Sequence, residues 1–129
     1  MAFVSKMDAA KSLSHPDWDS VKNALLELKN VRYSTVALYG KEAGQMMIEY
    51  AECQGYFISA FGEGEIEEWV VFDESKPTET VSVDISGNVD ELPKCVLVSD
   101  MVAMEVTRAF YVDGVRDPNH KWKKSIDLL

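Results

Sequence analysis

Between Arg32 and Val98 the sequence is a succession of short runs rich in β-branched and aromatic residues, separated by turns that contain glycine. Runs of this length and composition are typical of strands joined by hairpins. In the run 56–61, apolar residues occupy both alternating sets of positions, so we expect both faces of this strand to be covered. The predicted strands are 32–39, 46–53, 56–61, 67–73 and 80–85, with a short extended piece at 95–98.

An amphipathic segment precedes this region and is predicted to be a helix over 17–30. Pro16 prevents a helix from running across it, and Asp17 or Asp19 supplies a capping carboxylate for the backbone N–H groups that follow. Apolar residues then recur at helical spacing, at Val21, Leu25 and Leu28.

A second helix is predicted over 100–113, after Ser99 or Asp100 as its cap. Its apolar stripe comprises Val102, Val106, Ala109 and Phe110, and Gly114 stands where a left-handed residue ends a helix. The following tail holds Trp122 among lysines and is compatible with one last short strand. The sequence therefore predicts one α+β domain over 1–129, an antiparallel β-sheet meander flanked by an N-terminal and a C-terminal helix.

The net charge of −9 is concentrated in one segment of the chain. Residues 63–91 hold ten acidic residues and one base, Lys76, whereas the rest of the chain carries equal numbers of acids and bases. We expect this segment to create a region of negative potential. Nucleic acid and anionic membranes are poor partners for such a surface, and a basic protein is a good one.

The candidate binding residues come from this acidic segment and from the aromatic strand inside it. Trp69 adjoins the acidic cluster, and aromatic anchors within a charged rim are common at tight interfaces. Two other interpretations stay open: a solvated loop that keeps a strand edge soluble, and a hydrolase dyad built from Glu65, Glu67 or Glu68. The candidate partner-binding residues are Glu63, Glu65, Glu67, Glu68, Trp69, Asp73, Glu74 and Glu79.

No pattern of catalytic, metal-binding or cofactor-binding residues is apparent along the chain. The two histidines, His15 and His120, lie far apart in segments that we expect to be exposed, and the chain contains no Cys-x-x-Cys or His-x-x-x-His motif. Cys53 and Cys95 also lack paired spacing, which favours two buried, reduced thiols in a cytoplasmic protein. We therefore predict no enzyme activity, no metal and no cofactor.

Charged residues interrupt the N-terminal eighteen residues, which contain no unbroken apolar run. This segment is therefore predicted to be neither a signal peptide nor a membrane span. A cytoplasmic location is expected for the same reason.

In the C-terminal third, Phe110, Gly114, Arg116 and Pro118 follow the spacing Phe-x-x-x-Gly-x-Arg-x-Pro, and Trp122 comes soon after them. With this motif the segment resembles the first-numbered family of immunity proteins from bacterial polymorphic toxin systems. Family members end with a late helix and a Phe-x-x-x-Gly-x-Arg-x-Pro motif that is closed by a tryptophan. The similarity extends over roughly residues 33–126 and includes the strand Trp69–Asp73, Thr78-Glu79 and the Gly87-Asn88 turn. The matching positions of the C-terminal motif are Phe110, Gly114, Arg116, Pro118 and Trp122, with Pro93 upstream.

This resemblance implies a function in toxin neutralisation. Such proteins are encoded beside toxins whose C-terminal domains are often nucleic-acid deaminases and sometimes nucleases, and they bind those domains to inhibit them. Toxins that grip nucleic acid tend to expose basic clefts, which an acidic surface complements with fast, steered association. The alternative from another class is a small-molecule-binding or regulatory α+β domain with a solvated acidic rim. The sequence leaves the oligomeric state open.

Overall fold

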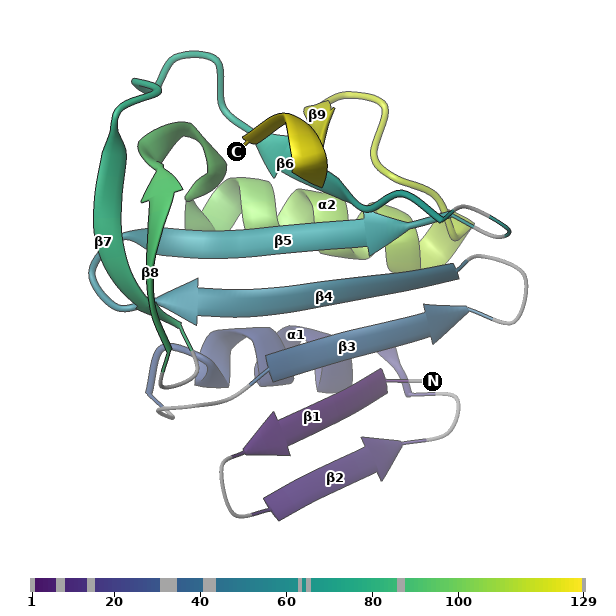
Figure 1. Cartoon of the computed structure of the whole chain (residues 1–129). Helices are drawn as coiled ribbons and strands as arrows, with labels where there is room; N and C mark the ends of the chain where they lie inside the picture. Colours follow the sequence, from purple (N-terminus) through teal and green to yellow (C-terminus); the bar gives the residue numbers. More distant parts are fainter. Residues whose placement is uncertain are drawn as a thin grey trace.

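An antiparallel sheet organises the fold, and both helices lie on one of its faces (Figure 1). The computed structural model describes residues 2–6, 9–13, 16–30, 35–40, 44–62, 64, 66–85 and 88–128. The strands of the main sheet are β1 (Ala2–Lys6), β2 (Ala9–Leu13), β3 (Thr35–Gly40), β4 (Gly44–Ala51), β5 (Gly55–Phe61), β6 (Trp69–Phe72) and β9 (Lys121–Lys124). Their order across this sheet is β2-β1-β3-β4-β5-β6-β9, and every neighbouring pair is antiparallel. The predicted α+β class is confirmed.

The two helices form where capping and apolar periodicity predict them. Helix α1 (Trp18–Glu27) begins after Asp17, whose side chain accepts a hydrogen bond from the backbone N–H of Ser20. Helix α2 (Asp100–Asp113) begins after Ser99, whose hydroxyl accepts from the N–H of Val102. It ends at Gly114, which has the left-handed φ of 69° that the sequence predicts.

The main core fills the space between the helices and the sheet. Leu25 of α1 and Phe110 of α2 pack there against strand residues such as Ile48 and Ile58, and Trp122 of β9 adds its ring from the last strand. Because alternate residues of β5 point to opposite faces, Tyr56 and Ile58 reach this core. Ser59 is also buried, so both faces of β5 are covered as predicted.

A two-stranded hairpin covers part of the other face of the sheet. Strands β7 (Thr80–Ile85) and β8 (Asn88–Pro93) cross one end of β4 and β5 (Figure 1). Val83 and Ile85 form a second cluster there with Ala51 and Leu97. In the described part of the chain, no helix is long and apolar enough to cross a membrane.

Several local predictions were wrong. Strands β1 and β2 were not predicted, and the extended piece predicted at 95–98 begins instead as a 3-10 turn, Lys94–Val96. Strand β8 (Asn88–Pro93) was not predicted, and it begins at a residue of the predicted Gly87-Asn88 turn. Cys53 is exposed rather than buried, because it occupies the β4–β5 turn with a φ of 63°, whereas Cys95 is buried.

Candidate functional site

The acidic segment and the basic C-terminal tail meet at strand β6. This strand is short and apolar, and β5 and β9 pair with its two edges. Its pairing with β9 places Trp69 opposite Lys124 and Phe72 opposite Lys121. Because β9 is rich in lysine, the fold brings positive charge directly beside the predicted binding residues.

Three of the predicted acidic residues are paired with lysines. Glu67 lies 2.9 Å from the ammonium group of Lys124, and Glu74 lies 3.2 Å from that of Lys121. The hydrogen bond to Glu67 is the main cause of the raised pKa of Lys124. In a third pair, a hydrogen bond from Lys94 lowers the pKa of Glu79.

Both side chains of each of these three ion pairs are exposed to solvent, so each pair contributes little to the stability of the fold. Water competes for both charges in such a pair, and salt screens their attraction. The three carboxylates therefore stay accessible to another cationic group. Lysines of the same chain nevertheless neutralise part of the negative charge that we predicted to attract a partner.

Two cationic side chains lie close to the ring of Trp69. The guanidinium carbon of Arg116 lies 5.0 Å from the centre of a Trp69 ring, and the ammonium nitrogen of Lys124 lies 5.6 Å from it. Both distances are within the range of cation–π attraction. The Nε1 atom of Trp69 is buried and has no hydrogen-bond acceptor among the residues that the structure describes.

The remaining predicted residues have different surroundings. Asp73 accepts hydrogen bonds from the hydroxyl of Ser75 at 2.6 Å and from its backbone N–H at 2.9 Å, which together lower the pKa of the Asp73 carboxyl. Glu68 is half-buried, and its carbonyl accepts from the N–H of Ser125. Glu63 and Glu65 lie outside the described residues.

The fold does not gather the predicted residues into a single patch. Glu67 and Glu68 precede β6, whereas Asp73 and Glu74 follow it, so the length of the strand separates the two pairs. Glu67 is exposed and bound to a lysine. A carboxyl group that acts as a general acid usually has its pKa raised by burial, and Glu67 lacks that burial. The surroundings of Glu67 therefore do not favour a role as a general acid.

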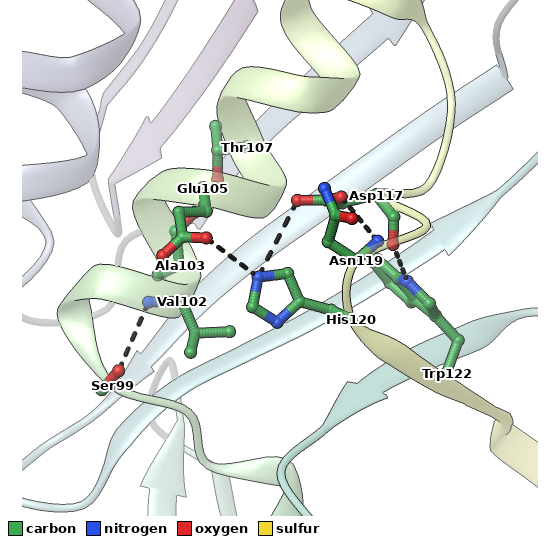
Figure 2. A network of polar contacts seen from close by, with 9 residues as sticks. All are labelled: Ser99, Val102, Ala103, Glu105, Thr107, Asp117, Asn119, His120 and Trp122. Atoms are coloured by element: carbon green, nitrogen blue, oxygen red, sulfur yellow. Dashed lines mark hydrogen bonds and ion pairs between the residues drawn. The ribbon is translucent and has the colours of Figure 1, made fainter.

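A second group of polar residues, which the sequence did not reveal, lies between α2 and β9 (Figure 2). His120 is not exposed as predicted, because only 19% of its side chain is accessible. Its Nε2 atom lies 3.3 Å from a carboxylate oxygen of Glu105 and 3.8 Å from one of Asp117. The spacing Asp-x-x-His just after a helix-ending glycine was the available signal, but only the fold brings Glu105 to it.

A scan against models of protein families found no match, and neither did a search among curated proteins.

Proposed function

We propose that this chain is an immunity protein that binds and inhibits the C-terminal domain of a cognate bacterial toxin in the cytoplasm. The observation that carries the proposal is the confinement of the whole net charge of −9 to residues 63–91. The resemblance of residues 33–126 to the first-numbered immunity family supports it further. A basic toxin domain, such as a nucleic-acid deaminase or nuclease, has the complementary charge.

The exposed ion pairs beside β6 support a role in binding. An arginine of a partner can replace Lys124 at Glu67, or Lys121 at Glu74, and offer two parallel hydrogen bonds where the lysine offers a point charge. Since the existing pairs are solvated, breaking them costs little. Desolvated carboxylate–arginine pairs across an interface then strengthen the complex.

The test compares two variants with the same net charge. In the first, Glu67→Gln, Glu74→Gln and Glu79→Gln remove three carboxylates of the acidic segment while preserving side-chain size. In the matched control, Asp19→Asn, Glu27→Gln and Asp113→Asn remove three exposed carboxylates from the two helices. Each variant is titrated calorimetrically with the toxin domain encoded immediately upstream, and association rates are measured as a function of salt.

We expect the acidic-segment variant to associate about tenfold more slowly than the control at low salt, with a shallower dependence on ionic strength. Equal affinities and rates for the two variants would place the interface elsewhere on the molecule. The absence of a complex between the unaltered chain and the upstream-encoded domain would refute the immunity function itself.

A further inference from the structure

Three side chains with metal-binding atoms converge between α2 and the C-terminal tail. They are Glu105 on α2, Asp117 in the loop after Gly114, and His120 just before β9 (Figure 2). One ligand atom from each, namely a carboxylate oxygen of Glu105, a carboxylate oxygen of Asp117 and Nε2 of His120, lies within 4.8 Å of the other two. All three groups therefore point toward one small volume.

The charges in this cluster are unbalanced. Two carboxylates face a single imidazole nitrogen, and Nε2 carries at most one hydrogen, which it can donate well to only one of them. At 3.8 Å the Oδ2 atom of Asp117 is too far from Nε2 for a hydrogen bond, although only 8% of this side chain is accessible to solvent. A divalent cation between the three groups would balance both carboxylates more completely than one imidazole can.

The surrounding structure fixes the positions of the ligand groups. The other oxygen of Asp117, Oδ1, accepts the backbone N–H of Asn119 at 2.9 Å. The Asp117 carbonyl accepts from Trp122 Nε1 at 3.0 Å and from the N–H of His120 at 3.2 Å. Glu105 is held by the regular helix α2. Supporting hydrogen bonds of this kind orient metal ligands in proteins.

We propose that Glu105, Asp117 and His120 form a binding site for Zn²⁺. Ligand atoms at about 2.0–2.2 Å from a tetrahedral zinc ion lie roughly 3.3–3.6 Å from one another, close to the 3.3 and 3.8 Å observed here. The imidazole ligand favours zinc over Ca²⁺ or Mg²⁺, which prefer sites made of oxygen atoms alone. Three protein ligands leave a fourth position for water or for a group from a partner, as the half-exposed Glu105 allows.

The experiment is a calorimetric titration of the full chain with zinc chloride after treatment with a chelator. Cys53 is an exposed, free cysteine, and thiolates are zinc ligands, so all proteins carry Cys53→Ser to remove this competing ligand. We expect one ion per chain. Glu105→Gln, which alters a half-exposed side chain without emptying the core, should weaken binding at least tenfold, and His120→Ala should weaken it further.

The control is His15→Ala, which removes the second histidine of the chain and should leave affinity and stoichiometry unchanged. As an independent readout, a given zinc concentration should raise the melting temperature of the His15→Ala protein by more than that of Glu105→Gln. Failure of zinc to bind the parent protein would overturn the proposal. Binding that survives both Glu105→Gln and His120→Ala, or that His15→Ala abolishes, would overturn it as well.

Discussion

Replacement of the buried Tyr56 by phenylalanine should change both the stability of the protein and its dependence on alkaline pH. The side chain is 1% exposed, and its hydroxyl donates a hydrogen bond to the carbonyl of Leu25 in α1 at 3.2 Å. Burial is the main cause that raises the pKa of this phenol to about 12, and the negative charges of Asp100 and ionised Tyr50 add to the effect. In the unfolded chain the same group titrates near its ordinary value of 10.0.

Near pH 8 the Tyr56 phenol is protonated in both states, and Tyr56→Phe removes one hydrogen bond at a cost of about 1 kcal/mol. Above pH 10 the phenol of Tyr56 loses its proton first in the unfolded state. The contribution of the protonated phenol to the stability of the folded state is therefore complete below pH 10 and disappears as the pH rises toward 12. At pH 11 this linkage lowers the free energy of unfolding of the unaltered protein by about 1.4 kcal/mol. The phenylalanine variant escapes this loss.

The two proteins should therefore approach equal stability at pH 11 despite their difference at pH 8. Urea denaturation of both proteins at the two pH values measures this convergence. A stability difference that stays constant from pH 8 to pH 11 would show that Tyr56 ionises as readily in the folded state as in the unfolded one.

Three further predictions concern the ends of the helices and the last strand. Gly114→Val should lower the free energy of unfolding by at least about 1–2 kcal/mol, because a β-branched residue is strained at a φ of 69°. An unchanged urea midpoint would contradict this. Trp122→Ala should cost about 2–3 kcal/mol through lost packing, and Trp122→Phe markedly less, as denaturation of both variants would test. Asp17→Ala should lower the melting temperature near neutral pH, because the cap hydrogen bonds that lower the pKa of Asp17 are lost. The difference in melting temperature should vanish as the pH falls below 3.8 and through the lowered pKa of the Asp17 carboxyl in the folded protein. A difference that persists at such low pH would argue against stabilisation by a charged cap.

Local patterns predicted much of the fold because their causes are local. Capping by Asp17 and Ser99, apolar periodicity and the helix-ending Gly114 gave both helices within a few residues. Strands β1 and β2 have no comparable local signal, since alanine, serine and lysine make up most of their sequences. The pairing of β1 with β3, which is far along the chain, decides their structure.

The candidate site was less predictable because it depends on the pairing of β6 with β9. Counting charges located the acidic segment in the sequence, yet it could not show that Lys121 and Lys124 lie against Glu74 and Glu67. The exposed position predicted for His120 was wrong because the sequence did not show that the C-terminal tail packs against α2. Its contact with Glu105 exists only once the tail has folded back onto α2.

The position of β9 at the edge of β6 has a consequence for the chain while it is being synthesised. Strand β6, with the sequence Trp-Val-Val-Phe, is the kind of short, uncharged, β-prone segment that recruits other chains into aggregates. The lysine-rich strand that covers its edge is the last strand of the main sheet to leave the ribosome. Until those residues are synthesised, this edge of β6 has no partner strand within the main sheet, and we expect the carboxylates that flank β6 to discourage its pairing with another chain.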